Sequence, residues 1–189
     1  FPGQEFGNAL AEILFGKESP SGKLPTTYPK KLSDTPAYSS YPGKHLQMDY
    51  KEKLLVGYKW YDKKKIEPLF PFGHGLSYSK FKLKKISITK KKHEIKIKVK
   101  LKNIGDFSTF ETVQCYLERK AVKAEIPKKK LVDFKKLKVT ENKSKKLTLK
   151  VSKRDLSEWD VKKSKWESAK GDYIIHVGTS LKDISITEE

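Results

Sequence analysis

Apolar residues and lysines alternate along much of the chain after residue 80, and this alternation constrains the fold more than any other feature. Between Glu94 and Leu101 the odd positions are Ile95, Ile97, Val99 and Leu101, and the even positions after Glu94 are lysines. Successive side chains of a strand point to opposite faces, so the run predicts a strand with one buried and one solvated face. Further strands are expected within Phe81–Ile88, Val113–Leu117, Leu131–Val139, Leu147–Val151 and Tyr173–Val177.

Sequences that favour turns separate these runs. They lie at Lys90–Lys92, Asn103–Asp106, Glu141–Asn142 and Lys170–Asp172. Six or seven short strands with such spacing, over about 110 residues, are typical of a β-sandwich of the immunoglobulin or fibronectin type III kind. We therefore predict a mainly β fold, with this sandwich formed by residues 80–189.

The stretch Pro68–Tyr78 has a composition that neither a helix nor a regular strand favours. It contains two prolines, two glycines, three aromatic residues and one histidine. Proline fixes φ and has no N–H to donate, and glycine allows positive φ or a close backbone approach. Since the apolar side chains still favour burial, we interpret this stretch as a connector packed onto a surface.

Residues 1–79 contain one clear helical signal. In Asn8–Phe15, Leu10, Ile13 and Leu14 lie on one helical face, and Gly16 is a typical stop signal. A single short helix cannot bury its apolar face alone, so it must pack on something outside this chain. The rest of this region, rich in proline, glycine, serine and tyrosine, is expected to wrap over a larger body as an extended segment.

The positive charge is unevenly distributed. Residues 1–79 carry 11 lysines and 8 acidic residues, a net of +3, whereas residues 80–189 carry 31 basic and 15 acidic residues, a net of +16. Such a domain could bind nucleic acid. However, the lysines alternate with apolar residues and outnumber arginines 40 to 2, which favours a solvated sheet face. We therefore expect no nucleic-acid partner.

Two further observations limit the class of protein. The sequence contains no run of 18 apolar residues, so no membrane span is expected, and its first residues do not resemble a signal peptide. The lone Cys115 lies in an apolar run and is expected to be a small buried residue. The sequence also starts without a methionine, which suggests a fragment.

The four histidines do not form a metal-binding pattern. None has a partner at the i+3 or i+4 spacing, so neither a metal nor another cofactor is expected. His176 lies between Ile175 and Val177 and is expected to face solvent, and His93 is expected in a turn. His74, between two glycines, is expected to hold the connector in place through hydrogen bonds. These residues are His45, His74, His93 and His176.

The acidic residues also suggest structural roles. Glu5 precedes the helix, where a carboxylate is favoured by the helix dipole. Asp155 and Asp160 are expected in a turn that carries a buried Trp159. Gly3 and Gly7 do not form a phosphate-binding loop, since no Gly-Lys-Ser follows them. The residues themselves therefore predict no catalytic residue and leave any substrate-binding residue unknown.

Several long blocks, in order and covering the whole chain, resemble glycoside hydrolase family 3, the β-glucosidases and β-xylosidases. The first block comprises Pro2–Glu5, Asn8–Ala11, Leu14–Gly16, Ser19–Pro25 and Thr27–Pro29, and the second comprises Val56–Asp62 and Ile66–Phe81. The third comprises Asn103–Gly105, Glu111, Val113, Gln114 and Tyr116, followed by Pro127, Leu131, Phe134 and Lys135. The last comprises Arg154–Ser157, Trp159, Asp160, Trp166, Gly171–Tyr173, Val177, Gly178, Asp183 and Ile184.

The resemblance implies a place for this chain in a retaining β-glycosidase. A (β/α)8 barrel with the nucleophilic aspartate and an α/β sandwich with the acid/base glutamate would precede it. Residues 1–79 would be the end of the α/β sandwich domain plus the connector, and residues 80–189 the fibronectin type III-like domain. Both catalytic carboxylates would precede Phe1, so this chain alone would be inactive and would pack on both domains. The substrate would be a β-linked glucoside or xyloside.

Three residues depart from the family pattern, and two other functions stay open. Phe6, Lys53 and Thr109 stand where the family usually has glycine, and Phe6 could reshape a nearby pocket wall. The chain could instead be a non-catalytic binding module whose basic face docks an acidic polymer or surface. It could also be a truncated product with an exposed apolar helix.

Overall fold

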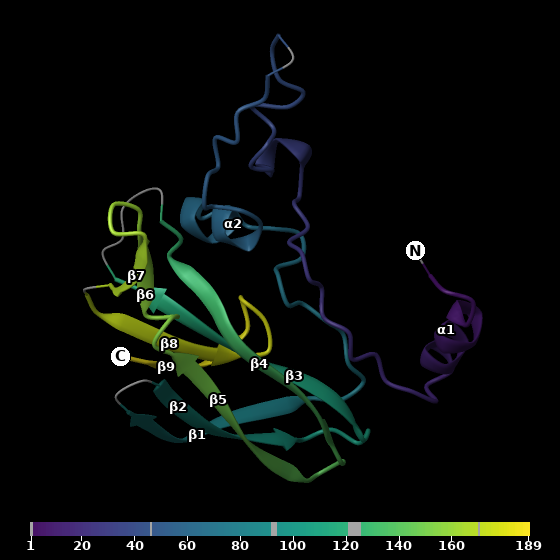
Figure 1. Cartoon of the computed structure of the whole chain (residues 1–189). Helices are drawn as coiled ribbons and strands as arrows, with labels where there is room; N and C mark the ends of the chain where they lie inside the picture. Colours follow the sequence, from purple (N-terminus) through teal and green to yellow (C-terminus); the bar gives the residue numbers. More distant parts are fainter. Residues whose placement is uncertain (1, 46, 92–93, 121–125, 170) are drawn as a thin grey trace.

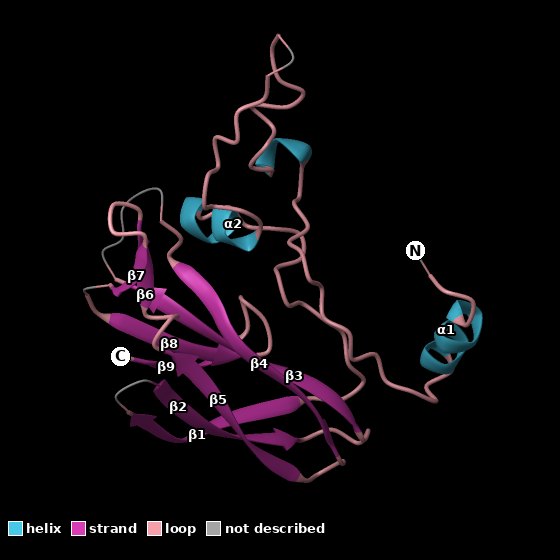
Figure 2. Ribbon diagram, in the orientation of Figure 1, coloured by secondary structure: helices cyan, strands magenta, loops and turns pink. Residues whose placement is uncertain are grey.

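The computed structural model describes residues 2–45, 47–91, 94–120, 126–169 and 171–189 (Figure 1). Most of its regular structure is β, and all of its strands follow residue 80 (Figure 2). The helices are α1 (Phe6–Leu14), the short 3-10 helix η1 (Leu32–Asp34) and α2 (Tyr58–Lys64). The strands are β1 (Phe81–Lys90), β2 (Glu94–Asn103), β3 (Thr109–Arg119), β4 (Lys129–Val139), β5 (Ser144–Ser152), β6 (Ser157–Asp160), β7 (Lys165–Ser168), β8 (Tyr173–Gly178) and β9 (Ile184–Glu188).

Two antiparallel sheets form the predicted sandwich. One sheet has the order β1-β2-β5 and the other the order β4-β3-β8-β9. The chain crosses from the first sheet to the second between β2 and β3 and returns between β4 and β5, as in an immunoglobulin-like fold. Strands β6 and β7 form a separate hairpin beside the second sheet (Figure 1).

The core lies between the two sheets and consists of the apolar residues that the alternation placed on one face. Ile97, Val99 and Leu101 of β2 are fully buried, and they face residues such as Val113 and Val177 of the other sheet. Cys115 is buried among them, as expected, and burial raises the pKa of its thiol to about 12. An apolar environment disfavours the thiolate, so this cysteine packs as a small apolar side chain.

Five elements were not predicted from the sequence, namely η1, α2, β6, β7 and β9. Asp155 lies in a turn, as predicted, but Trp159 and Asp160 lie in β6, and the prediction that Trp159 is buried is wrong. Trp159 is half exposed and packs edge-on against Trp166 of β7. Strand β9 was not expected. Helix α2 was not expected either, and its seven residues are too few to be stable without tertiary contacts.

Residues 2–80 form an extended segment with two different relations to the sandwich. Residues 19–28 and 69–79 run side by side: Leu24 N–H donates to His74 O at 2.8 Å, and Gly73 N–H donates to Leu24 O at 2.9 Å. This paired strip lies against the sandwich, whereas α1 and the loop above α2 extend away from it (Figure 1). No described residue of α1 is buried.

Candidate functional site

The outer face of the four-stranded sheet is the place where polar side chains converge. We call it the connector interface. It consists of Gly73 of the connector, Tyr58 and Asp62 of α2, Gln114, Tyr116 and Glu118 of β3, Lys128 directly before β4, Lys129 of β4, and His176 of β8. The β3 and β8 members are at most 9% exposed, although they point away from the sandwich core. The segment therefore buries this sheet on its second face.

The centre of the interface is Tyr116, which is fully buried. Its ring meets the ring of Tyr58 edge-on at a centroid distance of 6.3 Å, and its hydroxyl donates to Gln114 Oε1 at 2.5 Å. Burial, together with Tyr58, raises the pKa of Tyr116. Tyr58 also accepts a hydrogen bond from Leu131 N–H at 2.8 Å, so it ties α2 to strand β4.

Gln114 connects the connector to the turn between β8 and β9. Its Nε2 donates to Thr179 O at 2.9 Å and lies 3.4 Å from Gly73 O. Leu181 N–H of the same turn donates to Phe72 O at 3.1 Å. Gly73 and the side chain of Gln114 are both buried, and a Cβ at position 73 would lie 2.3 Å from Gln114 Oε1. This contact therefore needs a residue without a side chain at position 73.

A second group of interface residues is ionic. Glu118 Oε1 lies 2.9 Å from Lys128 Nζ, and its Oε2 lies 2.8 Å from His176 Nε2. Lys129 Nζ binds Asp62 Oδ1 of α2 at 3.0 Å. These ion pairs thus connect α2, β3 and β4, and His176 adds β8. Such a partly buried network fixes one orientation of the segment on the sheet.

Glu118 is expected to make this network sensitive to acid. Burial raises the pKa of Glu118, but hydrogen bonds from Lys128 and His176 outweigh it, and the net pKa lies below its usual value. A group with a lowered pKa in the folded state stabilises the fold above its unfolded pKa, and this contribution is lost as pH falls through the folded pKa.

We therefore expect Glu118→Gln to lower the free energy of unfolding by about 1–3 kcal/mol at neutral pH, since Lys128 loses its buried counter-charge. At an acid pH below the lowered folded-state pKa of Glu118, the difference from the unsubstituted protein should shrink, because the carboxyl is then protonated. Urea unfolding at both pH values measures this. Glu12→Gln, in an exposed pair with Lys17, is the matched control and should change little. An equal loss at both pH values would contradict the prediction.

The histidines lie in separate places. The expectation that His176 faces solvent is wrong: it is 9% exposed and bonded to Glu118 and to Thr187 Oγ1 at 3.1 Å. His74 is held through its backbone, which bonds Leu24 and Pro71, and its ring packs on Phe70 at 5.2 Å. His45 is exposed. The prediction for His93 falls outside the described residues.

The carboxylates singled out in the sequence do not converge either. Glu5 is at the N-cap of α1, and its Oε2 accepts a hydrogen bond from Asn8 at 2.6 Å. Asp155 accepts from Ser152 N–H at 2.9 Å in the turn before β6, and Asp160 accepts from Lys162 N–H at 3.0 Å. Helix α1 and the β6–β7 hairpin lie on opposite sides of the molecule (Figure 1).

Within the described ranges, no group of three or more histidine, cysteine or acidic side chains could hold a metal ion. No helix among these residues is long and apolar enough to cross a membrane. The polar residues that do converge, at the connector interface, are engaged with one another.

The roles of Gln114, Glu118 and Tyr58 were not predicted from the sequence, although one signal was available. Three of the four strands in the second sheet, β3, β8 and β9, contain no lysine, whereas β1, β2, β4 and β5 are rich in lysine. Lysine is rarely buried, so a strand that lacks it in so lysine-rich a chain is a candidate for burial on both faces.

Comparisons with known proteins place both halves of the chain. Residues 1–78 match the glycosyl hydrolase family 3 C-terminal domain, and residues 111–181 match the fibronectin type III-like domain. The chain is 42% identical over 190 residues to thermostable beta-glucosidase B of Acetivibrio thermocellus, covering 98% of this chain and 25% of that protein. It thus spans about a quarter of the length of such curated relatives.

Solved structures agree. The crystal structure of a GH3 beta-glucosidase of Bifidobacterium adolescentis matches with a TM-score of 0.93 and 34% identity, over 98% of this chain and 28% of that one. DesR, a beta-glucosidase from Streptomyces venezuelae solved in complex with D-glucose, matches with a TM-score of 0.92 and 35% identity, over 99% of this chain and 25% of that one.

Proposed function

The chain belongs to glycosyl hydrolase family 3, where it corresponds to the C-terminal part of its relatives, and we propose that it contributes architecture to a retaining β-glycosidase. The substrate would be a β-linked glucoside or xyloside, cleaved by double displacement between two carboxylates. Both carboxylates would come from domains that this chain does not contain. Its own role would be to pack on these domains and hold them in place.

The observation that carries the proposal is the exposed apolar surface of residues 2–79. Of the 22 large apolar residues that are exposed in the described chain, 15 lie in this region. On α1 alone, Phe6, Leu10 and Leu14 are 51%, 40% and 69% exposed, and Phe15 directly after it is 89% exposed. Apolar surface of this extent usually marks an interaction site. A barrel and an α/β sandwich domain are the partners that this family supplies.

The same proposal divides the chain into residues 1–79, the end of an α/β sandwich domain with its connector, and residues 80–189, a fibronectin type III-like domain. Two observations support this division. The first regular strand begins at Phe81. The match to the family 3 C-terminal domain ends at residue 78, and the match to the fibronectin type III-like domain covers residues 111–181. Phe6 belongs to the exposed face of α1, where it would touch the partner domain.

Hydrolysis of an aryl β-glucoside and an aryl β-xyloside tests the proposal. The chain alone should release no product, and addition of the polypeptide encoded upstream of it should produce activity. The preferred aryl sugar then identifies the glycoside. Activity of the chain alone would contradict the proposal, and Glu5, Asp155 and Asp160 would then be the first residues to substitute.

A variant of α1 separates assembly from folding. Leu14→Asp should leave the unfolding of the chain unchanged, because Leu14 is 69% exposed, yet it should weaken the complex with the upstream polypeptide and so lower its activity. Glu12→Gln on the same helix is the control and should assemble normally. If Leu14→Asp assembled as well as the control, α1 would not be the contact.

A further inference from the structure

The outer face of the three-stranded sheet carries an array of lysines in register. We call it the lysine face; it consists of Lys82 and Lys84 of β1, Lys96, Lys98, Lys100 and Lys102 of β2, and Lys146 and Lys150 of β5. Within these three strands, every residue of which the structure describes, the only acidic residue is Glu94. Eight lysines and one glutamate give this face a net charge of +7.

Seven of the eight lysines of this face are directly opposite another lysine, and Lys98 is opposite Ser87 and Thr148. Lys84 pairs with Lys100, and Lys100 pairs with Lys146, so three like charges form one row across the sheet. Lys82 with Lys102 and Lys96 with Lys150 form two further pairs. Opposed like charges destabilise a sheet, whereas opposite charges would stabilise it. The register therefore concentrates charge at a cost to stability.

Little within the chain neutralises this charge. Glu94 binds Lys96 at 2.9 Å, and this hydrogen bond lowers the pKa of Glu94. In the described part of the chain, the ammonium groups of Lys84, Lys100 and Lys146 have no carboxylate within ion-pair distance. Lysines that only kept the sheet soluble could be interspersed with acids, as they are elsewhere in this chain. The unneutralised array points to an anionic partner outside the chain.

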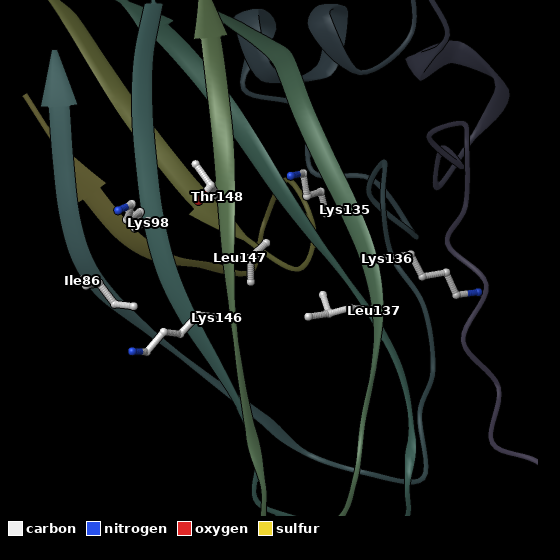
Figure 3. A pocket seen from close by; sticks show the side chains of 8 residues that line it. All are labelled: Ile86, Lys98, Lys135, Lys136, Leu137, Lys146, Leu147 and Thr148. Carbon is white, nitrogen blue, oxygen red and sulfur yellow. The ribbon is translucent and has the colours of Figure 1, made fainter. Parts of the chain in front are cut away.

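A hollow extends the array to the edge of the other sheet. It has a volume of about 640 Å³ and lies between β5 and β4 (Figure 3). Lys98 and Lys146 line it from the lysine face, and Lys135 lines it from β4 (Figure 3). The side chain of the neighbouring Lys136 is directed away, with its Nζ 5.4 Å from the centre of the Phe110 ring. Asp133 on β4 accepts hydrogen bonds from Lys150 N–H and Phe134 N–H, both at 2.8 Å, which orient its carboxylate but leave its negative charge. Lysines on both sides of the hollow suit an elongated anion that lies along it.

The lysine face would remain accessible in the assembled enzyme. Within residues 2–80, which carry the proposed contacts to other domains, the paired strip and α2 lie against the four-stranded sheet, and α1 extends away from the sandwich (Figure 1). The three-stranded sheet lies on the far side of the sandwich from α2 and the connector. The array is thus directed away from the proposed domain partners.

We propose that the lysine face binds a linear acidic polysaccharide, one that bears carboxylates along its length. The side chains favour this partner over two others. No aromatic side chain of the face can stack on bases, and no arginine is present for bidentate reading, which disfavours nucleic acid. Only Ile86 offers a large exposed apolar group, so a lipid surface gains little. The choice of a polysaccharide also rests on the proposed function.

The test measures binding of the 189-residue chain to polygalacturonate by affinity electrophoresis, with neutral dextran as the uncharged control. We expect retardation by polygalacturonate alone and a loss of affinity of roughly tenfold or more between about 50 and 200 mM salt, since binding releases counterions. Duplex DNA and vesicles containing phosphatidylserine are run in parallel. Tighter binding to either of these would overturn the choice of partner.

Two triple variants of equal charge locate the site. Lys84→Gln with Lys100→Gln and Lys146→Gln removes one row, and should weaken binding roughly tenfold and lower the salt slope by about three, one unit per lysine. The control, Lys44→Gln with Lys51→Gln and Lys162→Gln, removes three exposed lysines elsewhere and should bind normally. Equal losses in both variants, or no binding by the unsubstituted chain, would overturn the proposal.

Thermal unfolding shows that the row variant is folded. Because the variant relieves repulsion between opposed lysines, its Tm should be equal to or above that of the unsubstituted chain. A lower Tm would mean that the three lysines stabilise the sheet, which would contradict the repulsion that we infer between them. Hydrolysis by the chain together with the upstream polypeptide is measured separately, so loss of polymer binding and loss of the proposed activity are distinguishable.

Discussion

Replacement of Asn103 by alanine is expected to lower the free energy of unfolding by about 3–5 kcal/mol, which is a large part of the stability of a domain this size. Asn103 is fully buried at the end of β2, where the sandwich meets the connector. Its Nδ2 donates to Phe107 O at 2.7 Å and to Val139 O at 3.0 Å. Its Oδ1 accepts from Ser79 Oγ at 2.5 Å and from Gly105 N–H at 3.0 Å.

The alanine variant would leave these four groups without their partner in a space that water cannot readily enter. Each unsatisfied buried group costs about 1–3 kcal/mol, partly relieved by local rearrangement. Urea unfolding followed by tryptophan fluorescence measures the loss. Ser79→Ala is the matched control, since it removes one of the four bonds, and it should cost about 1 kcal/mol. If both variants lowered the free energy of unfolding equally, the four hydrogen bonds of Asn103 would not carry the stability that we assign to them.

Replacement of Gly73 by alanine is expected to detach the connector from the sandwich and to lower the free energy of unfolding by about 2–4 kcal/mol. Gly73 has a φ of +78°, which an alanine adopts only with strain. A Cβ there would lie 2.3 Å from Gln114 Oε1 and 2.9 Å from Gln114 Cδ. Gln114 cannot move aside cheaply, because it would lose its bonds to Tyr116 and Thr179.

Limited proteolysis distinguishes detachment from general unfolding. In the Gly73→Ala variant, proteases should cut within residues 57–79 while the sandwich from Phe81 onward stays intact. Gly22→Ala is the matched control on the paired strip, because a Cβ there meets nothing within 4 Å and the backbone has no positive φ. It should be cut like the unsubstituted chain. If Gly73→Ala resisted proteolysis equally, the connector would not depend on this close approach.

The strands of the sandwich could be predicted because their signal is local. Period-2 alternation in β2 and β5 depends only on which residues are apolar, and it identified Ile97, Val99 and Leu149 as core residues without knowledge of the partners. The family resemblance rests on such local blocks as well. The exposed apolar face of α1 was likewise predictable, because helical periodicity shows that a face exists, whatever covers it.

Other features depended on contacts between distant residues. Helix α2 is too short to be favoured by its own sequence, and is held by contacts such as Tyr58 with Leu131 and Asp62 with Lys129. Trp159 was predicted to be buried, since tryptophan usually is, but β6 lies in a hairpin at the side of the sheet, where the Trp159 ring packs against Trp166 and stays half exposed. Neither outcome can be derived from neighbours in the sequence.

The sequence alone therefore determined strands β1 to β5 and β8, the face of these strands that is apolar, and that most of the charge lies beyond residue 80. The tertiary structure decided what covers the other face of each sheet. Alternation gave His176 a solvated position, but the connector buries it against Glu118, because a packed segment replaces water over β3 and β8. Among the described residues no such segment lies over β1, β2 and β5, and the register of the strands sets Lys84, Lys100 and Lys146 in one row. Burial of a second face depends on residues far away in the chain, and periodicity within a strand does not record them.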